Sequence, residues 1–65
     1  MIQVTRANGG ATMAFNPYHI HHLTPSPNGG TYLYYTHDAH FEVKEDFKNV
    51  IEQFEYWMKA YNLKP

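Results

Sequence analysis

Three of the chain's five histidines fall within six residues, in the stretch YHIHHL at positions 18–23. If this stretch is a strand, His19 and His21 point to one face, because side chains alternate along a strand. Two such imidazoles could ligate zinc or copper if a third ligand, such as His40, lay on a neighbouring strand. No histidine pair has a diagnostic spacing, so we expect no metal and no cofactor; His19, His21 and His40 come closest to a metal site.

The same histidines allow two other interpretations. The plainer one is that they are ordinary surface residues of a strand that faces water. Gathered in an assembly, they could instead make that assembly sensitive to pH, because an unperturbed imidazole titrates near about pH 6.5.

Tyrosines in the stretch TYLYYTH, residues 31–37, suggest a ligand-binding alternative. Tyr32 and Tyr34 would share one face of a strand, and an exposed pair of tyrosines can stack on the rings of a nucleotide. With Arg6, His19 and His21 at an oligomer interface, they could form a small β module that binds a nucleotide-like anion, in a phage or mobile-element context. The plainer interpretation is that the tyrosines support packing across strands.

Nucleophilic catalysis finds little support in the residue types. Ser26 is the only serine and stands between two prolines, and the chain has no cysteine. Asp38 beside His37 is a pairing that turns contain by chance, so no nucleophile with a positioned base is indicated. We therefore expect that the protein is not an enzyme.

Length and charge limit the remaining classes. The 65 residues suffice for one domain, 1–65, which buries only about 60% of its unfolded surface and cannot use disulfides. Assembly as a homo-oligomer would offset this small core. The net charge of -1 offers no basic face for nucleic acid. Without an apolar run of about 18 residues or a signal peptide, we expect a cytoplasmic protein that does not insert into membranes.

Residues 1–43 have the alternating pattern of short antiparallel strands. Residues 2–6 and 11–15 flank Asn8-Gly9-Gly10, which favours a hairpin whose type I′ turn needs positive φ at Asn8. Further strands are expected at 18–24, after Asn16-Pro17, and at 31–37 and 40–43. The predicted fold is α+β, a sheet of about five short strands followed by one helix.

From residue 44 to residue 62 the apolar period changes from two to 3.6, which predicts an amphipathic helix with Glu45 and Asp46 at its start. Its apolar stripe comprises Phe47, Val50, Ile51, Phe54, Trp57, Met58 and Tyr61.

This helix would be about 27 Å long, whereas strands of five to seven residues span about 17 to 23 Å. One end should therefore project, and we expect it to pack against a second copy or a protein partner. The predicted interface residues are Phe54, Trp57, Met58 and Tyr61. The alternative is that the sheet curls enough to cover the whole stripe.

Several short motifs keep an order and spacing that resemble the FlbD family of flagellar and swarming motility proteins. They are, in chain order, MIQVTRANGG at the start, Asn16-Pro17, the apolar positions Ile20 and Leu23, Pro27, YLYYT, FEVKED and the helical pair Val50-Ile51. The resemblance implies a non-enzymatic accessory role in motility, with flagellar motor components as partners. The family's acidic residues after Asn-Pro are replaced here by histidines, so a contact made by that segment would differ.

Overall fold

The computed structural model describes residues 1–62, and it describes side chains as far as residue 60. Its elements are β1 (Ile2–Thr5), β2 (Thr12–Phe15), the short 3-10 helix η1 (Pro17–His19), β3 (His22–Pro25), β4 (Thr31–Tyr34), β5 (His40–Val43) and α1 (Phe47–Asn62). The predicted α+β class is confirmed.

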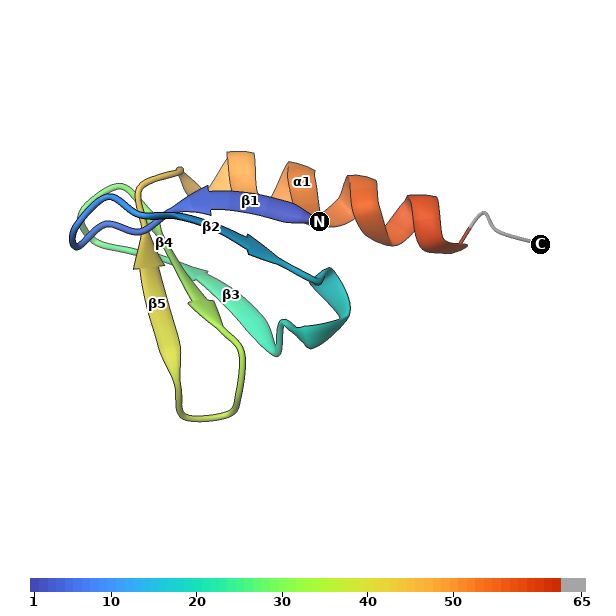
Figure 1. Ribbon diagram of the computed structural model, residues 1–65, viewed down its shortest axis with the longest axis horizontal. Coiled ribbons are helices and arrows are strands. Elements are labelled where there is room, and N and C mark those ends of the chain that lie inside the picture. Colours follow the sequence, from blue (N-terminus) through green and yellow to red (C-terminus); the bar gives the residue numbers. More distant parts are fainter. Residues whose placement is uncertain (63–65) are drawn as a thin grey trace.

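The strands form two antiparallel sheets, β1-β2 and β3-β4-β5, where the sequence predicted one. They meet at one end through a bridge between Arg6 and Val43. Beside it, the Ala7 N–H donates to the Glu42 carbonyl at 2.9 Å and the Lys44 N–H donates to the Thr5 carbonyl at 2.8 Å. Figure 1 shows the strands converging at this end and spreading apart at the other.

The first hairpin pairs Ile2 with Phe15 and Val4 with Met13. Ile2 and Val4 are fully buried, so the apolar face predicted for this hairpin is confirmed. The predicted type I′ turn at Asn8 is wrong, because the positive φ angles belong to Gly9 (89°) and Gly10 (72°). Gly9 and Gly10 lack a Cβ, so both adopt the left-handed conformation without strain. The left-handed residues of the turn therefore lie one position later than predicted.

The third strand begins later than predicted, at His22. Asn16 and Pro17 initiate a helical turn rather than a strand, because Pro17 occupies the first position and the Asn16 side chain accepts the Tyr18 N–H at 3.0 Å. His19 therefore lies in η1. The prediction that His19 and His21 share one strand face is wrong.

The fourth strand ends at Tyr34 rather than at His37. Thr36 Oγ1 accepts the N–H groups of Asp38 and Ala39 at 3.3 and 3.0 Å, which folds residues 35–39 into the turn before β5. At the other end of β4, a Cβ on Gly30 would lie 2.1 Å from the Val43 carbonyl oxygen. Only glycine allows this close approach.

Helix α1 begins at Phe47, three residues after the predicted start. Asp46 caps it by accepting the Asn49 N–H at 2.8 Å. Glu45 stays outside the helix and accepts the Thr5 N–H and hydroxyl at 2.8 and 2.9 Å. It thereby ties the start of α1 to the end of β1.

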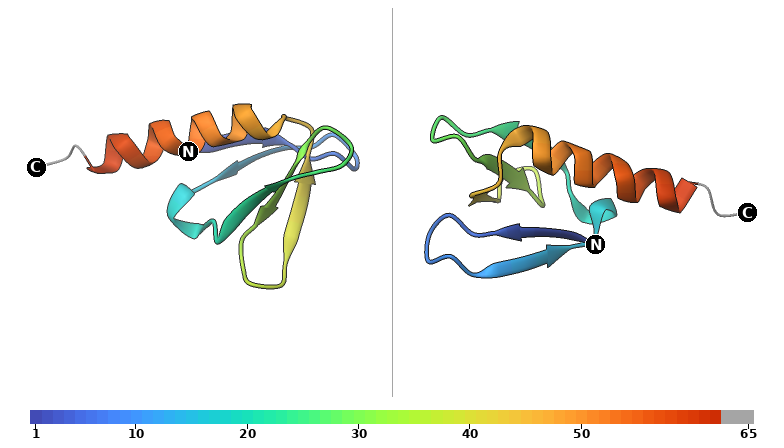
Figure 2. Two further views of the ribbon diagram at one scale, coloured as in Figure 1. Left: turned by 180° about the vertical axis from the view of Figure 1, so that it is seen from behind. Right: turned by 90° about the horizontal axis from the view of Figure 1, so that it is seen from above.

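The core lies where α1 crosses the two sheets. Seen from above, α1 runs between β1 on one side and β3 on the other (Figure 2). The buried core residues are Ile2, Val4, Leu33, Val43 and Val50. On the β1 side, the Gln53 amide accepts the Gln3 N–H at 3.1 Å and donates to the Gln3 carbonyl at 3.0 Å. The side chain thus pairs with the strand edge as a neighbouring strand would.

Candidate functional site

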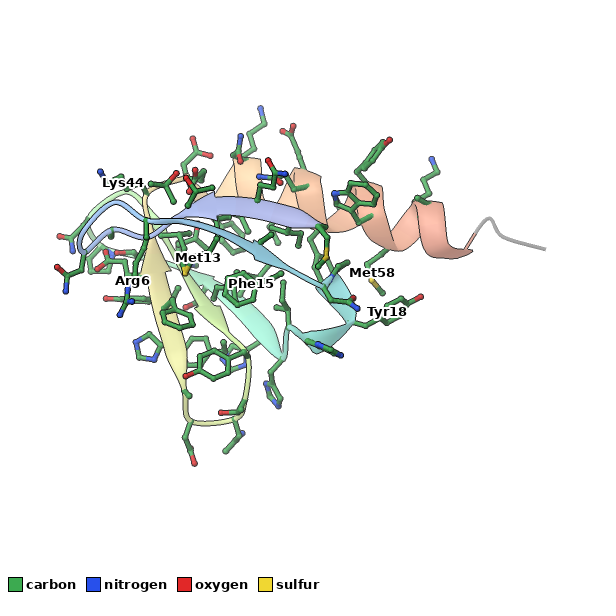
Figure 3. The ribbon with its side chains drawn as sticks, in the orientation of Figure 1. Arg6, Met13, Phe15, Tyr18, Lys44 and Met58 are labelled. Atoms are coloured by element: carbon green, nitrogen blue, oxygen red, sulfur yellow. The ribbon has the colours of Figure 1, made fainter. Side chains whose placement is uncertain are left out.

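The C-terminal turns of α1 extend beyond the ends of the strands, as the comparison of lengths predicts (Figures 1 and 2). Of the predicted interface residues, Phe54 and Trp57 are half-buried and pack against the core. Met58 is half-buried and points below the helix, on the side of η1 where Tyr18 lies (Figure 3). The Tyr61 side chain lies outside the described residues, so its predicted role stays a prediction.

A groove of about 250 Å³ separates α1 from β3, on the side of the helix opposite to β1. Its walls are Ile20, His21, His22, Leu23, Ile51 and Phe54. A more open hollow of about 350 Å³ lies next to it, lined by Tyr18, His19, Ile20, His21 and Tyr35. Ile20 and His21 belong to both, so the segment 18–23 forms a wall between the two concavities.

This groove was not expected from the sequence, because the pattern of residues 18–24 predicts a single strand there. The spacing of Ile20 and Leu23, three residues apart, is the signal that could have indicated a break in strand periodicity. Both side chains are half-buried against the core. Ile20 follows η1 directly, with its N–H donating to the Pro17 carbonyl at 3.2 Å.

Tyrosine and histidine rings cover the outer face of β3-β4-β5. The Tyr34 ring stacks on His22 at 4.0 Å between centroids and meets His40 at 4.7 Å on its other side. Tyr32 meets His40 edge-on at 5.1 Å, and His21 meets His22 at 4.9 Å. The strand register explains these contacts, since Tyr34 lies directly between His22 and His40. We call these rings the Tyr/His ladder.

The predicted ligand-binding residues do not gather on one face. Tyr32, Tyr34 and His21 belong to the ladder, whereas His19 lies in η1. The Arg6 guanidinium lies 5.1 Å from the centroid of the Phe41 ring. Phe41 pairs with Leu33 on the inner face of the sheet, opposite to Tyr32 and Tyr34. Because both sides of Tyr34 are covered by its neighbours, the tyrosine contacts favour packing across strands.

The histidines contact one another closely. His21 Nδ1 and His22 Nδ1 are 2.6 Å apart, so one of the two nitrogens is protonated and donates a hydrogen bond to the other. The His37 ring meets His21 at 5.6 Å. Among the described residues, no three His, Asp or Glu side chains form a group that could hold a metal ion. The His21 ring contacts His22 and the His40 ring contacts Tyr32. His19 and His21 line the open hollow.

Glu42 anchors the loop between β3 and β4. The Ser26 hydroxyl and the Asn28 side-chain amide both donate to Glu42 Oε2. These two hydrogen bonds, the Ser26 one foremost, lower the pKa of the Glu42 carboxyl below its usual value, with help from the charge of nearby His40. Ser26 is buried and accepts the Asn28 N–H at 3.2 Å. Its hydroxyl is therefore part of a loop-stabilising network.

These features define a small α+β protein in which one amphipathic helix covers two antiparallel sheets and extends past them. The sequence model of the FlbD family, flagellar and swarming motility proteins, matches residues 1–60. The chain belongs to this family, and the resemblance in its motifs is confirmed. No curated protein and no solved structure matches the chain. Within residues 1–62, no helix combines the length and hydropathy that crossing a membrane requires.

Proposed function

We propose that this flagellar and swarming motility protein acts without catalysis, as an interaction protein that assembles with copies of itself through the projecting end of α1. A single observation carries the proposal: α1 continues past the strands that cover its apolar stripe (Figure 1). Apolar side chains at such a position are typical of interface cores. A further apolar contact would also add to a small core, in which five hydrophobic side chains are buried among the residues that the structure describes.

Met58 is the residue best placed to make this contact. Phe54 and Trp57 contribute to the protein's own core, so their loss would weaken folding as well as binding. Met58 follows them on the same stripe and lies near the end of the described side chains. Its flexible, polarisable side chain suits a surface that packs against another chain.

A non-catalytic role agrees with the position of the only serine. Ser26 donates its hydroxyl to a carboxylate and not to a histidine base. We propose flagellar motor components as the protein partners of the assembled form, in keeping with the family's link to motility.

The proposal is tested by restoring motility to an organism that lacks the gene. Met58→Lys should fail to restore swarming, while Tyr56→Lys should restore it, because Tyr56 is exposed on the opposite side of the same helix. Both variant proteins should accumulate to the wild-type level on an immunoblot. Equal swarming with both variants would contradict a role for the end of α1.

A further inference from the structure

We propose that His21 and His22 form a two-histidine site that chelates a copper(II) ion through the Nδ1 atoms of both rings. These two nitrogens lie 2.6 Å apart, so both rings present a metal-binding atom toward the same point. The site is separate from α1 and does not depend on the self-assembly proposed above.

The backbone before β3 brings the two rings together. Neighbouring residues of a regular strand point to opposite faces, which would separate adjacent histidines. His21, however, precedes β3, which begins at His22. The His21 N–H donates to the Tyr34 carbonyl at 2.7 Å, which fixes the backbone at this point. Alternation along a strand pairs His21 with His19, whereas the structure pairs it with His22.

Neighbouring rings hold both imidazoles in place. The His22 ring stacks on Tyr34, with centroids 4.0 Å apart and ring planes inclined by 17°. The His21 ring meets His37 edge-on at 5.6 Å. These contacts limit the rotation of both imidazoles, so little ordering is needed when an ion binds. Both histidines are exposed, and an ion can therefore reach their nitrogens from solvent.

The separation of the two nitrogens selects the kind of metal. With metal–nitrogen bonds of about 2.0 Å, a tetrahedral ion holds two ligands about 3.3 Å apart, whereas adjacent ligands of a square-planar ion are about 2.8 Å apart. The observed 2.6 Å is closer to the square-planar value. Square-planar coordination by imidazole nitrogen and oxygen is typical of copper(II), which also binds such ligands most tightly among the first-row divalent ions.

Water completes the coordination of the ion. The site has two protein ligands, in keeping with the absence of a three-residue metal-binding group from the described part of the chain. The open hollow of about 350 Å³ that His21 lines provides space for water ligands. In the hydrogen-bonded pair one Nδ1 is protonated. When the ion binds, this proton passes to solvent and Nε2 of the same ring takes one up, so both rings bind the metal as neutral imidazoles.

Titration calorimetry with copper(II) chloride at neutral pH tests the site. The wild type should bind one ion per chain. His21→Gln and His22→Gln should each weaken binding by more than about tenfold, since even the loss of an outer partner of a metal ligand has an effect of this size. His19→Gln removes a histidine of η1 that lies outside the pair and should bind copper like the wild type. Circular dichroism should show the same fold in all three variants.

Electron paramagnetic resonance tests the geometry. The copper-loaded wild type should give an axial spectrum, which is characteristic of square-planar coordination, with hyperfine splitting from two equivalent nitrogens. His22→Gln should reduce the splitting to that of one nitrogen. Met58→Lys should bind copper like the wild type, because Met58 belongs to α1 and not to the histidine pair.

Three results would overturn the copper site: no binding by the wild type, equal binding by His21→Gln or His22→Gln, or a wild-type spectrum with fewer than two nitrogens. Each of them would leave the proposed self-assembly standing, because that proposal rests on the end of α1.

Discussion

At the scale of single residues, the carboxylate of Glu42 links stability to pH. Hydrogen bonds from Ser26 and Asn28 hold its pKa below the usual value in the folded protein. The unfolded chain therefore takes up its proton first as the pH falls, and the stabilisation present at neutral pH is lost through the acid range. Thermal unfolding of the wild type and Glu42→Gln, followed from pH 7 to about pH 3, should show a steeper acid loss in the wild type. Parallel curves would show that Glu42 does not carry this linkage.

Gly30 is required by the close contact between β4 and β5. A methyl group at this position would stand 2.1 Å from the Val43 carbonyl oxygen, which cannot move without disturbing the strand. Gly30→Ala should lower the free energy of unfolding by more than about 2 kcal/mol, measured by urea denaturation.

Gly9 provides the comparison, because a Cβ there meets no atom within 4 Å and the cost comes from its φ of 89° alone. Gly9→Ala should therefore destabilise less than Gly30→Ala, and the reverse order would contradict the steric account.

At the scale of elements, one amide side chain protects the edge of β1. Gln53 on α1 exchanges two hydrogen bonds with the backbone of Gln3. Gln53→Ala should remove about 1 to 2 kcal/mol of stability and accelerate amide hydrogen exchange at Gln3. Glu52→Ala, at the adjacent exposed position, is the control for lost side-chain packing. Unchanged exchange at Gln3 in Gln53→Ala would show that the strand edge does not depend on the helix.

Local sequence patterns correctly predicted the elements that are determined by residues close together in the chain. Alternation in β1 and β2 gave the buried pair Ile2 and Val4, and the 3.6-residue period gave the stripe of α1. The fifth strand also lies where it was expected. In contrast, Asn16-Pro17 was interpreted only as a break, although the same residues favour a helical turn. The mistaken strand at Tyr18 follows from that omission.

Long-range contacts escaped prediction because they depend on how the elements cross in space. Glu45 binds Thr5 and Gln53 binds Gln3 across separations of 40 and 50 residues. The two-residue and 3.6-residue periods of a sequence indicate strands and helices, but they do not show which residues of different elements will pair. The shared face of Tyr32 and Tyr34 was predictable from alternation. Their histidine neighbours were not, because the register between strands places His22 and His40 beside Tyr34.

At the scale of the whole molecule, the division into two sheets explains why much of the apolar stripe of α1 is only half-buried. The sheets join at one end only, and α1 spans the space between them before continuing outward (Figure 2). The predicted alternative, a single sheet curled over the whole stripe, is not what the strands form. This arrangement leaves a groove beside β3 and a helix end beyond the strands. We propose that this flagellar and swarming motility protein assembles with copies of itself through that helix end.

Sedimentation velocity of the wild type, Met58→Lys and Tyr56→Lys at micromolar concentration tests this claim most directly. The wild type and Tyr56→Lys should both sediment as assembled species. Met58→Lys should sediment as a folded monomer. Assembly would bury the lysine charge in the interface without an opposite charge to compensate it, which is energetically costly. A monomeric wild type, or an assembly that Met58→Lys leaves intact, would contradict the claim.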